Sequence, residues 1–97
     1  MKNAAPLILV IAAPLLAQAG DVLPADVAQF VQRRDLCDHF RGEEPFDAER
    51  RAFLAMRLRE FCTGTDRQFE ALRAKYQDNE DVMSKLNTYE TKVESAQ

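Results

Sequence analysis

Cys37 and Cys62 are the only cysteines in this sequence, and their chemistry depends on whether they pair with each other. An even number of cysteines predicts a disulfide if the chain reaches an oxidising compartment, and the N-terminal residues described below indicate export. Such a bridge would enclose 24 residues, and closing a loop of that size stabilises the folded state by about 3.5 kcal/mol. Because there is no C-x-x-C spacing, we expect a structural bridge and not a redox centre.

The single histidine, His39, precedes two adjacent acids, Glu43 and Glu44, in a loose H-x-x-x-E-E pattern. A metal site normally needs three or four convergent ligands, and cysteines held in a disulfide cannot supply the missing ones. We therefore expect no metal and no other cofactor. The acids also have a structural interpretation, since negative charge near the first turn of a following helix is stabilising.

The sequence has no set of residues typical of an enzyme. Its two serines, Ser84 and Ser95, lie in the polar C-terminal stretch, far from His39 in the sequence. There is no glycine-rich loop that could hold a phosphate group. We therefore expect no catalytic residues and predict that the protein is not an enzyme. A metal-dependent enzyme is the third class of function that we consider, after the two binding roles described at the end of this subsection.

Residues 1–19 have the features of a cleavable signal peptide. Lys2 gives a positively charged start, an apolar run follows, and the small residues Ala17 and Ala19 form an A-x-A cleavage site. The apolar run is shorter than the roughly 20 residues that a membrane-spanning helix needs. No cysteine lies near the cleavage point to accept a lipid. We predict a mature chain that begins at Gly20, has no membrane anchor, and is periplasmic or secreted.

Removal of the signal peptide would leave residues 20–97, a length suited to one small domain, with 12 basic and 16 acidic side chains. This negative balance argues against binding to nucleic acid. The charge is banded, because residues 50–75 are mainly basic while the segments on either side are mainly acidic. The simplest interpretation is that these segments pack on one another. We expect the partner to be another protein of the cell envelope.

Apolar residues at helical spacing predict a first helix that begins at Pro24, a favoured first helical residue. Its apolar face contains Val27, Phe30, Val31, Cys37 and Phe40. Arg34 interrupts this face, and we expect its stem to cover apolar surface while its head reaches solvent or an acid.

Gly42 and Pro45 predict a loop over residues 41–45. A second helix is expected to begin at Phe46 or Asp47. Its apolar positions are Phe53, Leu54, Leu58, Phe61 and Cys62. It should end at Gly64, because glycine is the usual residue just beyond a helix C-terminus.

The segment Thr65-Asp66-Arg67-Gln68 predicts a capping box at the start of a third helix, whose buried positions are Phe69, Leu72 and Tyr76. A break at Asp78-Asn79 separates it from a fourth helix, for which Val82, Leu86, Tyr89 and Val93 give the apolar spacing. The chain should fray from Ser95 onward. The predicted fold is therefore all-α, a small domain of three to four short helices stapled by one disulfide.

A disulfide restricts how the first two helices can pack. In a tight antiparallel hairpin, Cys37 would lie about 6 Å from the turn and Cys62 about 22 Å from it. The two Cα atoms of a disulfide lie within about 7 Å, so a tight hairpin is excluded. Either the first helix crosses the second steeply near Cys62, or it stops around His39 and residues 40–46 run extended along the second helix.

Residues 40–46 are also the best candidate for a partner-facing surface, since ordered loops often carry binding residues. Phe40 and Phe46 flank two adjacent carboxylates, Glu43 and Glu44, on a segment that the disulfide would hold in place. We predict that the acids make charged contacts with a partner and that the aromatic residues are either anchors or part of the core.

Two groups of residues resemble known families. The segment CDHFRGEEPFDAER, which begins at Cys37, together with CTGT at residues 62–65, resembles small exported proteobacterial proteins of unassigned function. Cys62 with Leu72 and Tyr76 is similar to the cysteine-rich helical family named for the LprI lysozyme inhibitor, although Arg73 stands where that family has asparagine. The second resemblance implies an inhibitor of a lytic enzyme.

These features together favour a non-enzymatic periplasmic or secreted protein-binding module, of the kind found among inhibitors and immunity proteins. The alternative is an envelope accessory or chaperone-like protein, which would expose apolar surface and bind many clients. The two hypotheses differ in the number of partners that they predict.

Overall fold

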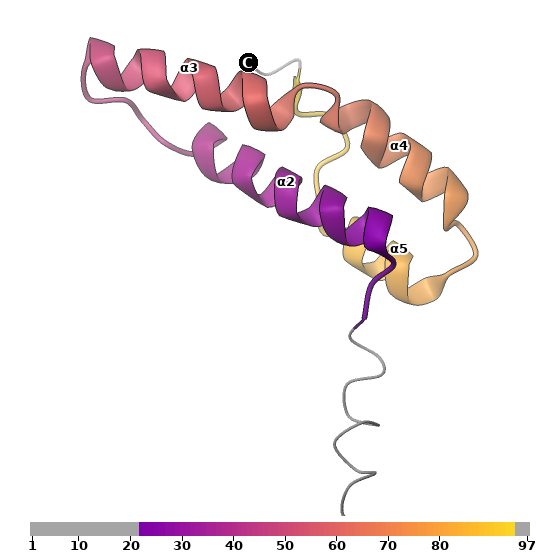
Figure 1. Ribbon diagram of the computed structural model, residues 1–97. Coiled ribbons are helices and arrows are strands. Elements are labelled where there is room, and N and C mark those ends of the chain that lie inside the picture. The colour runs from indigo at the N-terminus through magenta and orange to yellow at the C-terminus, as the bar shows by residue number, and fades with distance from the viewer. Residues whose placement is uncertain (1–21, 95–97) are drawn as a thin grey trace, which may run out of the picture.

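The computed structural model describes residues 22–94, which form four helices and no strand (Figure 1). The helices are α2 (Ala25–Arg41), α3 (Ala48–Cys62), α4 (Thr65–Lys75) and α5 (Glu80–Leu86). A disulfide joins Cys37 to Cys62, so the predicted all-α fold stapled by one disulfide is confirmed. None of the helices in the described part is long and apolar enough to cross a membrane. The predicted signal peptide, its cleavage site and the fraying tail lie outside the described residues.

Helix α2 begins one residue later than predicted, because Pro24 lies at its N-cap and the carbonyl of Pro24 accepts the amide hydrogen of Ala28 at 2.9 Å. Its buried side chains are Val27, Phe30, Arg34 and Cys37. Their spacing of three and four residues places them on one face of the helix.

Both ends of α3 follow from local sequence. The side chain of Asp47 accepts a hydrogen bond from the amide of Arg50 at 2.7 Å, as an N-cap aspartate does. The helix ends at Cys62, and Gly64 follows with a φ of +83°, in the left-handed region that favours glycine. The predicted stop at this glycine is therefore found in the structure.

Helices α2 and α3 run antiparallel with a large offset, which is how Cys37 and Cys62 meet with their Cα atoms 5.0 Å apart (Figure 1). The cysteines lie about 6 Å and 21 Å from the linker ends of their helices. Residues 42–47 cover this difference of about 15 Å, which lies within the roughly 20 Å that six residues reach at full extension. The second predicted arrangement is thus the observed one, except that α2 continues to Arg41.

One core cluster joins α2, α4 and α5. Its buried residues are Val27, Phe30, Phe69, Leu72, Val82 and Leu86. The rings of Phe30 and Phe69 stack with their centroids 5.5 Å apart, and Tyr89 meets Phe30 edge-on at 5.8 Å. A second, smaller cluster surrounds the disulfide, so the domain has two separate apolar centres.

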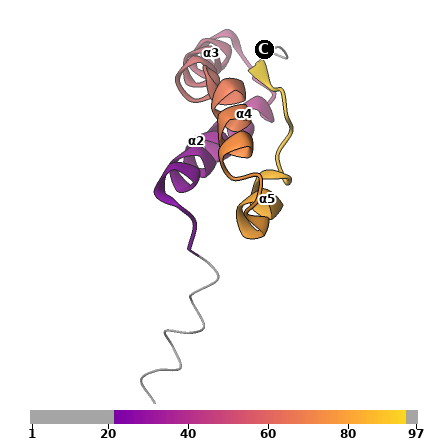
Figure 2. The same cartoon turned by 90° about the vertical axis from the view of Figure 1, so that its right-hand side faces the viewer.

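The predicted fourth helix is wrong beyond Leu86, where α5 ends. Residues 87–94, which we call the C-terminal strap, instead run back past α2 and α4 toward α3 (Figure 2). Tyr89 and Val93 therefore lie on the strap although their spacing fits a helix. The cause is a contact between residues far apart in the sequence. Arg34 donates from Nη2 to the carbonyl of Glu90 at 2.7 Å, so this carbonyl bonds to α2 and does not accept a hydrogen bond within a longer α5.

The predicted capping box at Thr65 is also wrong, because Thr65 is the first residue of α4 and not its N-cap. Its hydroxyl is buried and has no hydrogen-bond partner among the described residues. The strap satisfies this end of the helix instead, since Glu94 accepts the amide hydrogen of Asp66 at 2.9 Å. In return, the carboxylate of Asp66 accepts the amide hydrogens of Val93 at 2.9 Å and Glu94 at 3.2 Å.

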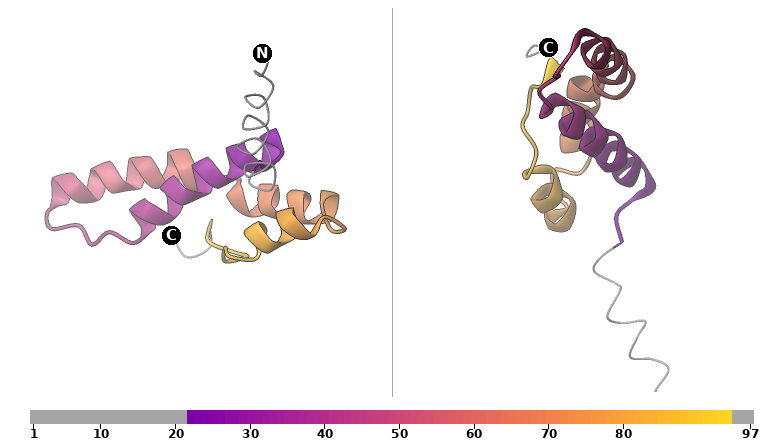
Figure 3. Two further views of the ribbon diagram at one scale, coloured as in Figure 1. Left: turned by 90° about the horizontal axis from the view of Figure 1, so that it is seen from below. Right: turned by 90° about the vertical axis from the view of Figure 1, so that its left-hand side faces the viewer.

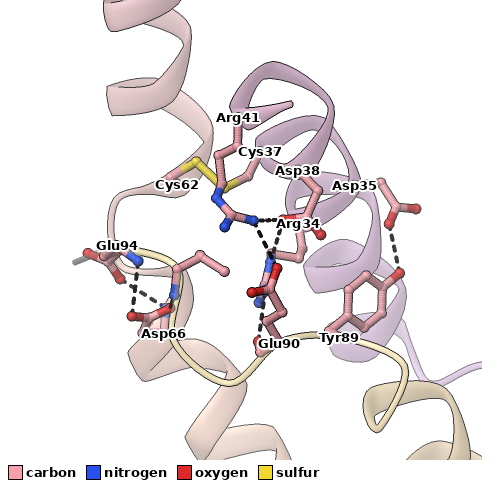
Figure 4. Close-up of polar contacts among 11 residues, drawn as sticks. Arg34, Asp35, Cys37, Asp38, Arg41, Cys62, Asp66, Tyr89, Glu90 and Glu94 are labelled. Carbon is pink, nitrogen blue, oxygen red and sulfur yellow. Dashed lines mark hydrogen bonds and ion pairs between the residues drawn. A yellow bond between two sulfur atoms is a disulfide. The ribbon is translucent and has the colours of Figure 1, made fainter. Parts of the chain in front are cut away.

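The head of Arg34 is buried and reaches an acid, not solvent (Figure 4). Its Nε donates to Oδ1 of Asp38 at 3.1 Å. The guanidinium also lies over the rings of Phe69 and Tyr89, with its central carbon 5.8 Å and 5.6 Å from the two ring centroids. Arg34 is thus the polar centre of the contact between α2 and the strap.

Candidate functional site

The α2–α3 hairpin extends away from α4 and α5, and its far end is the most prominent projection of the described structure (Figures 1 and 3). We call residues 42–53 the hairpin tip. It consists of the extended linker and the first part of α3. The offset imposed by the disulfide causes this projection, because α3 and the linker continue beyond the end of α2.

Glu43 and Arg50 join the linker to α3. Nη2 of Arg50 donates to Oε1 of Glu43 at 2.7 Å, and its Nε donates to the other carboxylate oxygen. These hydrogen bonds hold the pKa of Glu43 below its usual value and raise the pKa of Arg50. Two parallel hydrogen bonds fix both position and orientation. The Glu43 carboxylate, predicted to contact a partner, is therefore engaged within the tip.

Phe40 lies in an aromatic cluster at the base of the hairpin tip. Its ring stacks on Phe61 with a centroid distance of 6.0 Å and meets Phe53 edge-on at 6.1 Å. His39 meets Phe40 edge-on at 4.9 Å. Of the two roles predicted for this ring, anchor or core, the contacts favour the core.

Phe46 has the opposite environment, because 81% of its surface is exposed. It lies beside a hollow of about 400 Å³. The hollow is lined by Phe46, Asp47, Glu49, Arg50 and Phe53. The neighbouring Glu44 is exposed and has no ion pair among the described residues. The tip therefore combines an exposed aromatic ring with unpaired negative charge.

Arg50 and Phe53 belong to this site although the sequence analysis did not include them in it. The guanidinium carbon of Arg50 lies 4.6 Å from the centroid of the Phe53 ring, and that of Arg57 lies 5.1 Å from it. Such cation–π contacts stabilise the packing of these side chains. The seven-residue separation of Glu43 and Arg50 was the one available signal, and it is meaningful only once residues 42–47 are known to run beside α3.

The acidic side chains of the tip and His39 can be compared with the requirements of a metal site. In the described part of the chain, no three His, Cys, Asp or Glu side chains lie close enough together to hold a metal ion. His39, Glu43 and Glu44 do not converge, because Glu43 is paired with Arg50 and His39 packs against Phe40. The exposed ring of Phe46 and the carboxylates around it are suited to contact with another protein.

Comparison with known proteins returned no matching family model, curated protein or solved structure. The functional assignment therefore depends on the geometry of the hairpin tip.

Proposed function

We propose that this protein is a non-enzymatic protein-binding module of the periplasm or the secreted fraction, similar in role to an inhibitor or immunity protein, and that it binds through the hairpin tip. The observation that carries the proposal is the 81% exposure of Phe46 at the end of a hairpin held by the disulfide and the Glu43–Arg50 pair. Large aromatic side chains are frequent anchors in protein interfaces.

The order already present in the tip supports this proposal energetically. Binding by a mobile loop loses free energy through immobilisation, whereas a loop held by a covalent bridge and a two-point ion pair loses less. Glu43 thus contributes by positioning the loop, and Glu44 and Phe46 contribute contacts. This division differs from the sequence-based prediction, in which both acids had the same role.

The tip also indicates the chemistry of the partner. Phe46 requires an apolar pocket, and the exposed acids Glu44, Asp47 and Glu49 around it favour a basic rim. A complementary surface would therefore be an apolar depression flanked by lysine or arginine. Charge complementarity of this kind mainly raises the association rate and the specificity.

The alternative, an accessory or chaperone-like protein, would require a broad apolar surface. The large hydrophobic residues that are exposed in the described part are Val22, Leu36, Phe46 and Met56. They come from four separate segments: the start of the described chain, α2, the linker and α3. Phe46, which is 81% exposed, is the one that lies at the hairpin tip, and this favours one defined contact over the capture of many clients.

The compartment is part of the same proposal. A disulfide is compatible with an extracytoplasmic location, because thiols are kept reduced in most cytosols. The signal-peptide features of residues 1–19 point in the same direction.

Capture from an envelope extract of the producing cells tests the proposed function. The wild-type protein, Phe46→Ser and a control, Leu36→Ser, would be immobilised in equal amounts after their helix content has been compared by circular dichroism. Leu36 is a suitable control because it is also exposed, at 41%, but lies on α2. We expect one stoichiometric partner with the wild type and Leu36→Ser and its loss with Phe46→Ser. A broad set of unfolded proteins bound equally by all three would favour the accessory role instead.

A further inference from the structure

The C-terminal strap is attached to the domain at a few separate points. Tyr89 donates from its hydroxyl to Oδ1 of Asp35 at 2.7 Å, and the carbonyl of Glu90 accepts from Arg34 (Figure 4). Oε1 of Glu90 also accepts from Nη1 of Arg41 at 3.4 Å. These contacts hold the first half of the strap against α2.

The second half of the strap is attached to α4 by Asp66 alone, as far as polar contacts of the described residues show. Its carboxylate accepts the amide hydrogens of Val93 and Glu94, and the Glu94 side chain returns one bond to the amide of Asp66 (Figure 4). The two halves of the strap therefore have separate attachments.

Val93 connects the strap to the disulfide. Cys37, Cys62 and Val93 are fully buried and form one cluster, against which Leu58 and Phe61 pack. Four of these five residues lie on α2 and α3, the two helices that the disulfide joins. Val93 is the member that comes from elsewhere, so the strap supplies one wall of the disulfide's apolar environment.

The main core does not depend on this half of the strap. The buried residues shared by α2, α4 and α5 include none from residues 90–94, and Tyr89 is the last strap residue that packs against them. Displacement of residues 91–94 would therefore remove Val93 from the disulfide cluster, while the bond from Arg34 to Glu90 and the contacts among α2, α4 and α5 remain.

We propose that the C-terminal strap is a latch over the Cys37–Cys62 disulfide, and that its local opening, with the helices still folded, admits a thiol reductant. In the open state a dithiol reduces the bridge in two steps. One thiolate attacks a cysteine sulfur, so that a mixed disulfide forms and the other cysteine leaves as a thiolate that takes up a proton. The second thiolate of the dithiol then releases the first cysteine and becomes the oxidised product, which balances the two electrons.

Reduction kinetics in urea distinguish local opening from global unfolding. The rate of free-thiol appearance in dithiothreitol would be measured in the native baseline for the wild type, Asp66→Ala, Val93→Ala and Val82→Ala. Val82→Ala is the matched control, because Val82 is buried in the main core and does not contact the disulfide cluster. Each variant's global stability would be obtained from its own urea unfolding curve.

We expect the wild-type rate to be nearly independent of urea in the native baseline, since lifting a short strap exposes little surface. Asp66→Ala should reduce about tenfold faster or more because the charge-assisted bonds to the strap are lost. Val82→Ala should lower global stability and leave the native-baseline rate unchanged. Val93→Ala removes part of the side chain that covers the disulfide and leaves Asp66 in place. This variant should also accelerate reduction.

Rates that rise with urea in parallel with global unfolding in all variants would overturn the proposal. An unchanged reduction rate in both Asp66→Ala and Val93→Ala would overturn it as well.

Discussion

Opening the disulfide should lower the melting temperature of this domain substantially. The sequence separation of Cys37 and Cys62 is 25 residues, and the chain-entropy relation for that separation gives about 3.5 kcal/mol. A domain of this length shifts its melting temperature by roughly 4–8 °C for each kcal/mol, so reduction should lower it by about 14–28 °C. The loss should be of this order because reduction frees the unfolded chain from the loop that the bridge closes.

Thermal unfolding followed by circular dichroism, with and without reductant, measures this effect directly. The reduced wild type keeps both sulfur atoms, so the difference from the oxidised form reports the cross-link itself. The Cys37→Ala/Cys62→Ala double variant is the control, because reductant should leave its melting temperature unchanged. A shift below about 5 °C on full reduction would refute the reasoning, since it would mean that the bridge restricts the unfolded chain far less than the entropy relation requires.

Three further predictions concern polar groups. Thr65→Val should leave the free energy of unfolding unchanged or raise it, because the buried hydroxyl is unpaired; a capping role would instead cost about 1 kcal/mol, and urea unfolding separates the two. Glu43→Gln should lower the melting temperature and Glu44→Gln should not, since Glu43 alone is paired with Arg50. Asp26, on α2, accepts hydrogen bonds from Nζ of Lys75 at 2.7 Å and from the hydroxyl of Tyr76 at 2.8 Å. These bonds lower the folded-state pKa of Asp26, as the bonds from Arg50 lower that of Glu43. The melting temperature should therefore fall on acidification below about pH 4.5, because the stability that these carboxylates contribute is present above their unfolded pKa and is lost as the pH falls through their folded pKa. Asp26→Asn should flatten this acid dependence in a pH series of thermal melts.

The helix boundaries that the sequence predicted correctly are the ones fixed by local chemistry. Asp47 caps α3 through its own side chain, and Gly64 adopts a conformation that other residues rarely take, so both signals act within a few residues. Knowledge of the disulfide was enough to exclude a tight hairpin, because the rise of a helix and the reach of a bridge are fixed lengths.

The errors at Thr65 and beyond Leu86 have a common physical cause. The local pattern at Thr65 fits a capping box, and Tyr89 and Val93 continue a helical spacing, but the strap binds α2 and α4 through groups far away in the sequence. Beyond Leu86, a tertiary hydrogen bond from the buried Arg34 replaces the hydrogen bond that a continued helix would make. A pattern read over a short stretch of sequence contains no information about such distant contacts.

The position of the candidate site could be predicted from the sequence, but the role of each of its residues could not. Phe40 and Phe46 are both aromatic and flank the same acids, and only the positions of Phe53 and Phe61 on α3 decide that Phe40 is packed and Phe46 exposed. The different roles of Glu43 and Glu44 depend in the same way on Arg50, one side chain of the facing helix.

Site-specific photo-crosslinking tests most directly whether the hairpin tip is the binding surface. A photoreactive phenylalanine analogue would replace Phe46 in one strain and exposed Ala71 on α4 in another, and living cells would be irradiated. The proposed function predicts one discrete cross-linked species from position 46, of constant mass and absent from position 71. The absence of any cross-link from position 46, or the same adducts from both positions, would contradict it.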